Sequence, residues 1–344
     1  MLSEPVKIDS DPAVLLHAFL KTKGYSKFGV LMDENTRQHC YPLIRKALPD
    51  HYSIEVLSGE ENKTLTTCSV IWSQLTELGF DRHSLLIVLG GGVLGDMGGF
   101  CAATYKRGID FVLLPTTLLA QVDASVGGKL GIDFLHYKNH IGLFQQPTAT
   151  LIGTDFLKTL PEREVRSGFA EIIKHCLISD KVMWDTIRAK SMNDQDWQVL
   201  IQHSVKFKSF IIKEDPREAG LRKVLNFGHT VGHAIESHFL TSGNRVFHGE
   251  AIAIGMICES FIAHKKGQIS ADELDQISNY TKSIYGKISL ADQNDSILDL
   301  MAQDKKNKGN KILMALPLGI GKAVWDVEVS KKEIEESLEY YASL

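Results

Sequence analysis

The sequence predicts an N-terminal α/β domain with a Rossmann-like parallel sheet, followed by a mainly α-helical C-terminal domain. Short runs rich in Val, Ile and Leu alternate with amphipathic stretches in the first half, which is typical of a parallel sheet covered by helices. From about residue 160 the chain changes to long helical patterns with few strand-like runs. A length of 344 residues is sufficient for two domains.

Four apolar runs in the first half have the length and composition of buried strands. These strands are expected at residues 27–33 (KFGVLMD), 52–57 (YSIEVL), 84–92 (SLLIVLGGG) and 110–117 (DFVLLPTT). Between the second and third run, residues 66–80 (TTCSVIWSQLTELGF) have the apolar spacing of a helix that covers one face of a sheet. Strands that alternate with helices in this way favour parallel pairing.

Long helical patterns dominate the second half. They lie at residues 163–179, 197–215 and 248–267. Pro161 opens a helix well and is poorly tolerated inside one, so a boundary is expected close to it. We therefore predict domains at residues 1–160 and 161–344. Near the end, residues 310–325 (NKILMALPLGIGKAVW) are expected to add a strand or two.

The composition of the chain limits which binding partners and which cellular compartment can be expected. The formal net charge of -4 gives no overall basic field, so neither nucleic acid nor an anionic membrane is an expected partner. The five cysteines are scattered and contain no CxxC pair, which argues against disulfides and thiolate zinc sites. No apolar run approaches the roughly 20 residues of a membrane helix, and the N-terminus lacks the features of a signal peptide. We expect a cytoplasmic protein.

A glycine turn follows the third predicted strand. Gly90, Gly92 and Gly95 satisfy the GxGxxG pattern, which allows backbone amides and a helix N-terminus to approach a pyrophosphate. The acidic residue that usually holds the ribose lies about 20 residues further on, but here Asp110 falls at the start of a strand. Asp96, directly after the turn, is the better acidic contact. The alternative is a tight turn that binds nothing.

A polar run at residues 115–139 follows the fourth predicted strand, where open α/β sheets bind ligands. It has no clean helical or strand periodicity. Its candidate ligand-binding side chains are Thr116, Thr117, Asp123, Lys129, Lys138 and Asn139. Two lysines and an asparagine near a glycine pair suit a phosphorylated or carboxylated small molecule. The alternative is a solvated loop with ordinary surface lysines.

The helical half offers four candidate metal ligands, and a catalytic zinc site needs three protein ligands and an open position. His229 and His233 are four residues apart in NFGHTVGHAIE, so a helix would place both on one face. Glu171 and His248 lie among apolar helical neighbours, where a shared cation would offset the cost of burying them. The residues alone leave open which three bind the ion.

Five long motifs together resemble the successive motifs of the 3-dehydroquinate synthase family. They occur in the family's order within residues 58 to 321. The motifs are GGGVLGDMGGF, TYKRGIDFVLLPTTLLAQVDASVGGK, FLKTLPEREVRSGFAEIIKH, EDPREAGLRKVLNFGHTVGHAIE and HGEAIAIGM. The wider superfamily, which includes glycerol dehydrogenase-like enzymes, shares the glycine turn and the metal-bearing helices but not these longer strings.

The resemblance implies cofactors and their ligands. It gives Glu171, His229 and His248 to one divalent ion, zinc or cobalt, and leaves His233 for the substrate. It also implies NAD+ bound by a set of residues spread over the first domain. These are Glu60, Lys63, Gly92, Val93, Gly95, Asp96, Thr116, Thr117, Lys129, Lys138, Phe156 and Thr159.

A substrate pocket and a homodimer are implied as well. The pocket residues are Asp123, Lys129, Asn139, Lys174, Lys208, Arg222, Asn226, His233 and Lys306. Arg107 matches a residue that, in the family, reaches the pocket of the partner subunit. The implied reaction converts 3-deoxy-D-arabino-heptulosonate 7-phosphate to 3-dehydroquinate and phosphate, by oxidation with NAD+, phosphate elimination, reduction, ring opening and an intramolecular aldol. This is an early step toward chorismate and the aromatic amino acids.

The chain departs from the family's usual motifs at a few positions, none of them a charged ligand. Asp133, His136 and Tyr137 lie in the loop after SVGGK, Gln145 stands where an aromatic is common, and His175 where tyrosine is frequent.

Three other functions remain as alternatives. One is another sugar phosphate cyclase, such as a 2-epi-5-epi-valiolone or 2-deoxy-scyllo-inosose synthase. Another is a glycerol dehydrogenase-like oxidoreductase, and the third is a catalytically silent homologue. Three histidines without support from any motif are expected on surfaces, and these are His175, His203 and His238.

Overall fold

The computed structural model describes residues 6–135, 137–241, 246–290, 294–302 and 312–344. It divides into two compact units. The first comprises Met1–Val165 and Trp197–Ser209, and the second comprises Arg166–Asp196 and Phe210–Leu344. The division into domains at residue 160 stays a prediction.

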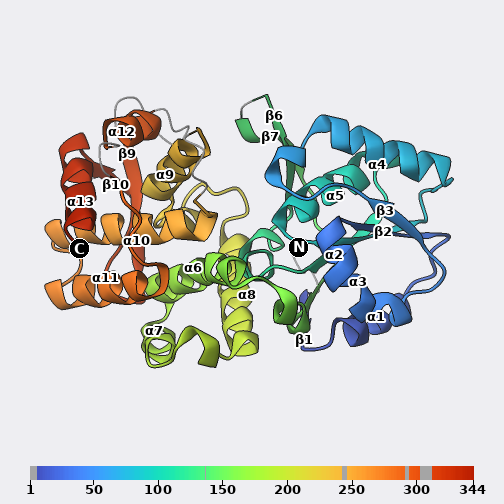
Figure 1. The fold of residues 1–344 in the computed structure, drawn as a ribbon, viewed down its shortest axis with the longest axis horizontal. Coiled ribbons are helices and arrows are strands. Elements are labelled where there is room, and N and C mark those ends of the chain that lie inside the picture. The colour runs from blue at the N-terminus through green and yellow to red at the C-terminus, as the bar shows by residue number, and fades with distance from the viewer. Residues whose placement is uncertain (1–5, 136, 242–245, 291–293, 303–311) are drawn as a thin grey trace. The chain divides into compact units, whose positions relative to one another are not determined.

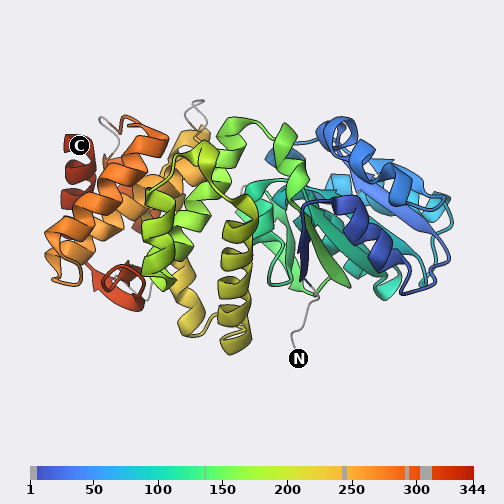
Figure 2. The same ribbon diagram turned by 90° about the horizontal axis from the view of Figure 1, so that it is seen from below.

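A six-stranded sheet forms the centre of the first unit (Figures 1 and 2). In spatial order its strands are β1 (Val6–Asp9), β8 (Ala149–Gly153), β5 (Asp110–Pro115), β4 (Leu85–Gly90), β2 (Phe28–Met32) and β3 (Tyr52–Glu55). Every neighbouring pair is parallel. The four strands expected from the sequence are all present, so the predicted Rossmann-like sheet is confirmed.

Helices cover both faces of this sheet. Every residue of β4 is buried, and its side chains alternate between two cores, as the two-residue period of a strand requires. Leu86 and Val88 pack in the core that includes α4 (Leu65–Glu77) and α5 (Gly92–Thr104). Ile87 packs in the opposite core, which includes α1 (Pro12–Leu20) and α3 (Tyr41–Ile44). Helix α2 (Glu34–His39) packs against α3.

The polar run at 115–139 is more ordered than its sequence suggests. A single π-helical turn spans Ala120–Ala124, and an antiparallel hairpin follows, formed by β6 (Lys129–Phe134) and β7 (Tyr137–Phe144). Most of β7 is exposed, so its residues do not show the alternation of a half-buried strand. This lack of alternation explains why periodicity did not reveal the hairpin.

The second unit is mainly helical, as predicted. Its helices are α6 (Glu162–Ser179, from Arg166), α7 (Lys181–Arg188), α9 (His229–Thr241), α10 (His248–Lys265), α11 (Ala271–Tyr285), α12 (Asn294–Ala302) and α13 (Lys331–Ser343). The two strands expected near the end form an antiparallel pair, β9 (Ile312–Pro317) and β10 (Ala323–Val329). Helix α8 (Trp197–Glu214) belongs to the first unit as far as Ser209 and to the second from Phe210.

Helix α10 is the centre of the second unit. It packs against α9, α11, α13 and β9, and it is buried on nearly all sides. Two of its glycines permit close backbone approaches. A Cβ on Gly249 would stand 2.1 Å from the carbonyl oxygen of Ser167 on α6, and one on Gly255 would stand 1.9 Å from that of Gly228, just before α9. Glycine at these positions lets the first turns of α9 and α10 lie close to neighbouring backbone.

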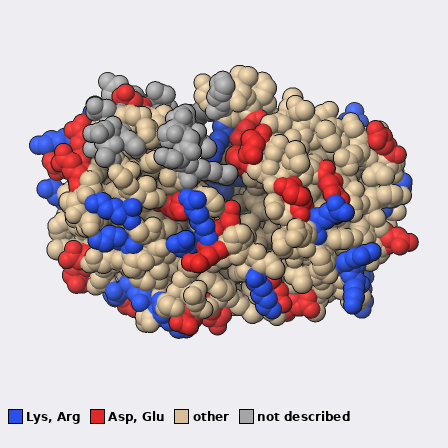
Figure 3. All heavy atoms as spheres, viewed as in Figure 1, with Lys and Arg blue, Asp and Glu red and all other residues tan. Residues whose placement is uncertain are grey.

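Two surface properties complete the description. Among the described residues, no helix has both the length and the apolar character needed to cross a bilayer. On the face seen in Figure 3, basic and acidic side chains are intermixed over the described part of the chain.

Candidate active site

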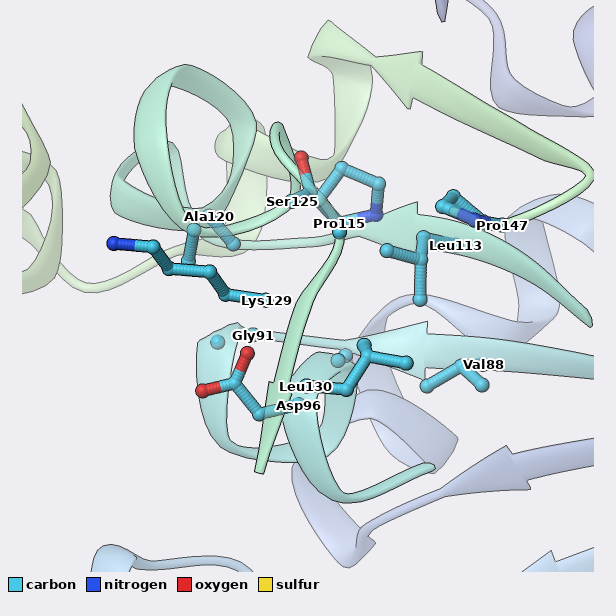
Figure 4. Close-up of a pocket in the computed structure, with 15 residues that line it drawn as sticks. Val88, Gly91, Asp96, Leu113, Pro115, Ala120, Ser125, Lys129, Leu130 and Pro147 are labelled. Carbon is cyan, nitrogen blue, oxygen red and sulfur yellow. The ribbon is translucent and has the colours of Figure 1, made fainter. Parts of the chain in front are cut away.

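The glycine turn of the first unit joins β4 to α5 and lines a pocket. Gly92 and Gly95, at the start of α5, line it together with Asp96 and Lys129. In Figure 4, Asp96 and Lys129 lie toward one end of the pocket, and Val88, Leu113 and Pro147 lie toward the other. The pocket therefore combines an apolar portion with charged groups beside a helix N-terminus, which suits a nucleotide.

Gly95 shows how the turn is shaped for a ligand. Among the described residues, no atom outside the adjoining backbone of α5 lies within 4 Å of the position that a Cβ on Gly95 would occupy. Packing within the chain therefore does not require glycine there. Because Gly95 lines the pocket, a methyl group would enter space that a ligand could fill.

Lys63 joins three segments that are distant in the sequence. Its Nζ donates to Asp96 Oδ2 on α5 and to Asn139 Oδ1 on β7, both at 2.6 Å, and only 3% of the residue is exposed. Burial raises the pKa of Asp96, and the charge of Lys63 opposes that rise. Asp96, predicted to bind NAD+, and Asn139, predicted to bind the substrate, thus accept hydrogen bonds from the same ammonium group.

Asp123 and Lys208 form a second charged pair in the first unit. Lys208 lies on α8, and its Nζ contacts Asp123 Oδ1 at 2.5 Å and the Asp123 carbonyl oxygen at 2.6 Å. Asp123 belongs to the π-helical turn, a distortion that is frequent at functional sites. The sequence predicted both residues for the substrate but gave no indication that they meet.

The other nucleotide-binding candidates have varied surroundings. Thr116 and Thr117 follow β5, and Lys138 is exposed on β7. Phe156 packs in the core beneath the sheet, so contact with a nucleotide would have to come from its backbone. Glu60 opens a short 3-10 turn and Thr159 ends another.

Several pocket residues were not predicted. They are Val88, Gly91, Leu113, Pro115, Ala120, Ala124, Ser125, Gly128, Leu130 and Pro147. Most are apolar or small and carry no chemical indication in a sequence. Gly128 is the exception, because GG in SVGGK indicates an unusual backbone, and its φ is +63°.

The second unit brings together Glu171, His229 and His248. Their ligand atoms all lie within 4.8 Å of one another. Glu171 Oε1 is 3.4 Å from His229 Nε2 and 3.6 Å from His248 Nε2. Two ligands of a tetrahedral zinc ion with bonds of about 2.1 Å are about 3.4 Å apart, so both of these distances fit such an ion.

Hydrogen bonds orient both imidazoles. His229 Nδ1 lies 3.1 Å from the carbonyl oxygen of Phe227, and His248 Nδ1 lies 3.2 Å from Glu236 Oε2. Each Nδ1 faces an acceptor. In the neutral form of either ring the proton therefore lies on Nδ1, and Nε2 keeps a lone pair on the side of Glu171. Three potential electron-pair donors thus converge in a largely buried place, an arrangement that a cation stabilises.

The electrostatics of the cluster fit this assignment. Burial alone would raise the pKa of Glu171, but Lys174 and the neighbouring histidines hold it below its ordinary value. Burial and the charge of Lys174 lower the pKa of His229, so this imidazole is neutral. Burial would lower the pKa of His248, yet Glu171 and Glu236 raise it to about 9. A proton and a cation would therefore compete for His248 Nε2.

His233 lies beside the cluster but is more exposed. Its ring centroid is 5.0 Å from that of His229 and 5.9 Å from that of His248. Its ligand atoms also fall within 4.8 Å of Glu236 and His248, an alternative grouping on the outer side. Glu236 was not predicted from the sequence. Its spacing of three residues from His233 could have indicated that the two side chains share one face of a helix.

Lys174 and His175 surround the other oxygen of Glu171. Lys174 Nζ forms a buried ion pair with Glu171 Oε2, and His175 Nε2 lies 4.0 Å from the same oxygen. His175 is fully buried, so its expected position on a surface is wrong. It follows Glu171 by one helical turn and therefore shares the inner face of α6. His203 and His238 are partly exposed.

Arg222 and Asn226 lie on a short 3-10 helix, Leu221–Asn226. The Arg222 guanidinium is buried and donates to the carbonyl oxygen of Pro216 at 3.1 Å, and Asn226 Nδ2 donates to Glu218 Oε1 at 2.9 Å. The loop before them is held by Asp215, whose carboxylate accepts the backbone N–H groups of residues 219, 220 and 222.

Arg107 is neither a lining residue of the glycine-turn pocket nor one of the candidate metal ligands. Arg107 is exposed beyond the end of α5, in a turn where Lys106, Arg107 and Gly108 have positive φ values of 49°, 68° and 109°. Among the described residues no acidic side chain pairs with Arg107. Lys306 lies outside the described residues.

Known proteins match this chain along most of its length. The family model for the N-terminal part of 3-dehydroquinate synthase matches residues 53–167, and the model for the C-terminal part matches residues 168–307. The chain is 39% identical over 348 residues to the 3-dehydroquinate synthase of Parabacteroides distasonis, covering 99% of this chain and 98% of the relative. It is 45% identical over 285 residues to that of a Sulfurovum species, covering 80% of each.

A solved structure is similar over its whole length. It is the 2-epi-5-epi-valiolone synthase from Streptomyces hygroscopicus subsp. jinggangensis with NAD+ and Zn2+ bound. The TM-score is 0.88 at 26% sequence identity, and the match covers 100% of this chain and 98% of that one.

Proposed function

Because the chain belongs to the 3-dehydroquinate synthase family, we propose that it converts 3-deoxy-D-arabino-heptulosonate 7-phosphate to 3-dehydroquinate and phosphate, with NAD+ and a divalent cation. Support for the cofactors comes from the pocket at the glycine turn and from the NAD+ and Zn2+ of the valiolone synthase structure. The observation that carries the proposal for the cation is the spacing of the ligand atoms on the buried Glu171 and the partly buried His229 and His248.

The chain's own residues would bind and orient the substrate. When bound, the cation supplies Lewis acidity to a substrate hydroxyl, and NAD+ takes up and returns a hydride. Lys174 keeps the Glu171 carboxylate ionised. The guanidinium of Arg222 suits the substrate carboxylate, because its planar fork can form two parallel hydrogen bonds.

Further residues serve the remaining substrate groups. Asp123 fixes the ammonium group of Lys208, which can then serve as a positioned cation for the carboxylate. His233, exposed beside the cluster, suits the substrate phosphate. The nucleotide would lie against the glycine turn, with Asp96 as its acidic contact.

A direct test is turnover of the heptulosonate phosphate by the purified protein. We expect one phosphate released per 3-dehydroquinate formed, with NAD+ regenerated in each turnover. Turnover of another sugar phosphate in its place would support a different cyclase, and steady growth of the NADH absorbance would support a dehydrogenase. Either result would refute the proposed reaction.

We further propose a homodimer in which Arg107 enters the partner's pocket. Support comes from its exposed position on a turn of three residues with positive φ, a conformation that costs free energy in Lys and Arg. Mixed dimers of Arg107→Ala and His233→Ala would test it, because one site per mixed dimer would then be intact. With random exchange of subunits, about one quarter of the wild-type activity should return. No recovery on mixing would contradict the proposal.

A location in the cytoplasm is proposed on the basis of the cysteines. All five are free and buried, which is typical of proteins kept in a reducing compartment. Localisation of a tagged chain by cell fractionation would check this.

A further inference from the structure

Two ligands of the proposed cation site occupy equivalent positions on paired helices. His229 is the first residue of α9 and His248 is the first residue of α10. The helices pack in opposite directions, because the positions where a Cβ would stand on Gly228 and Gly232 approach Met256 and Ile252 respectively. The start of each helix therefore lies beside a later turn of the other.

A glutamate of α10 binds the start of α9. Glu259 is fully buried, and its carboxylate accepts three backbone N–H groups, from Gly228 at 2.6 Å, Thr230 at 3.0 Å and Val231 at 3.1 Å. These are orphan donors of a first helical turn, which a side chain at the N-cap usually satisfies. Gly228, just before α9, has no side chain with which to do so. Glu259 thus fixes the backbone on both sides of His229.

A glutamate of α9 binds the start of α10 in return. Glu236 Oε2 lies 3.2 Å from His248 Nδ1, and the Glu236 side chain is 17% exposed. This contact orients the ring of His248 directly, whereas Glu259 acts on His229 through the backbone. Each helix therefore supplies a carboxylate that holds the metal-ligating first residue of the other.

Electrostatics give these carboxylates a second effect. A helix N-terminus carries about half a positive charge, and here two such ends lie beside the position proposed for a cation. A carboxylate at each end offsets that unfavourable charge. Groups that orient metal-bound histidines typically change metal affinity by 10–100-fold when they are altered.

We propose that Glu259 and Glu236 are positioning residues of the cation site, and that they set its metal affinity by fixing His229 and His248. The inference rests on the proposed ligand set Glu171, His229 and His248. Neither glutamate needs to touch the cation or the substrate for this role.

The experiment measures cobalt and zinc binding to the full-length chain by competition with a chromophoric chelator. Glu259→Gln and Glu236→Gln are each expected to weaken the affinity by about 10–100-fold and to change the visible absorption of bound Co2+. Glu273→Gln is a matched control in the same unit. Glu273 lies in the first turn of α11 and, like Glu259, accepts backbone N–H groups, here those of Ser270 and Ile320. It should bind the metal as wild type does.

The outcomes separate the two proposals. If wild-type protein binds no stoichiometric metal, or His229→Ala binds it normally, the proposed ligand set is wrong. If wild type binds metal and both folded glutamine variants bind it with unchanged affinity and spectrum, the positioning role is wrong. Should Glu259→Gln fail to fold, Glu236→Gln decides the question. The Glu236 side chain is partly exposed, so its substitution does not leave buried backbone N–H groups without an acceptor. An unchanged affinity in that variant overturns the inference.

Discussion

The two units prepare their sites by opposite means. At the glycine turn of the first unit, ligand-binding positions arise where side chains are missing, and Gly95 faces space that no side chain of the described residues fills. In the second unit, Glu171, His229 and His248 must place particular atoms within a few ångströms, and glycines serve to bring backbones together. A change of glycine to alanine should therefore weaken ligand binding in the first unit and destabilise the fold in the second.

Loss of a metal ligand should have the largest effect. It would test whether metal binding in the second unit depends on each individual ligand atom. His229→Ala should lose stoichiometric metal, with affinity reduced by at least about 100-fold, beyond what loss of an orienting partner causes. His233→Ala should keep the metal and lose turnover. Metal analysis after dialysis, together with a turnover assay, checks both. An empty site in His233→Ala would mean that the outer grouping of His233, Glu236 and His248 holds the ion.

Gly255→Ala would test the close approach of α9 and α10. Its Cβ would meet the carbonyl oxygen of Gly228 at 1.9 Å, and backbone atoms have little freedom to move aside. We expect a loss of about 3 kcal/mol in the free energy of unfolding, measured by urea denaturation, and weaker metal binding. Gly24→Ala is the control, since apart from its chain neighbours no atom of the described residues lies within 4 Å of its Cβ position. Equal stability of the two variants would show that the helices can separate without cost.

Lys63→Met would test whether charge pairing matters at the first site. It leaves Asp96 mostly buried without that ammonium group, so we expect a loss of up to about 3 kcal/mol at pH 7 and weaker NAD+ binding. Burial already raises the pKa of Asp96, and removal of Lys63 should raise it further. Relative to wild type, the loss should therefore grow as pH rises above the already raised pKa of Asp96 in the wild-type protein, and it should vanish below that pKa, where the carboxyl is protonated in both proteins. Urea denaturation at several pH values measures this loss of stability. A loss that does not change with pH would contradict this account.

Gly95→Ala should have the smallest effect on stability and gives the sharpest contrast with Gly255→Ala. Gly95 lies within α5 and its Cβ position is open, so alanine should change stability by about +0.5 to +1 kcal/mol through helix propensity. NAD+ binding, measured by calorimetry, should nevertheless weaken by about tenfold or more, because the methyl group enters the pocket. Unchanged affinity would place the nucleotide elsewhere.

The sequence predicted the elements whose patterns are periodic and missed those that depend on distant partners. The buried strands and long helices followed from apolar runs, and the candidate metal ligands could be recognised as polar residues in apolar helices. The hairpin β6–β7 was missed because its exposed strand has no alternation. Glu259 was missed because its partners lie about 30 residues earlier, at the start of another helix, and no local pattern records them. His175 was misplaced because the inner face of α6 extends one turn beyond Glu171.

The order in which the chain is synthesised bears on the pairing of Asp123 with Lys208. The first unit resumes at Trp197, after the segment Arg166–Asp196 has been added to the second. A ribosome that has made the whole sheet has therefore not yet made the lysine that neutralises Asp123, 85 residues further on. A gene fragment ending at Val165 would encode the complete sheet and glycine turn but not this cation. Dissection of the protein into separately expressed halves must accordingly return residues 197–209 to the first half.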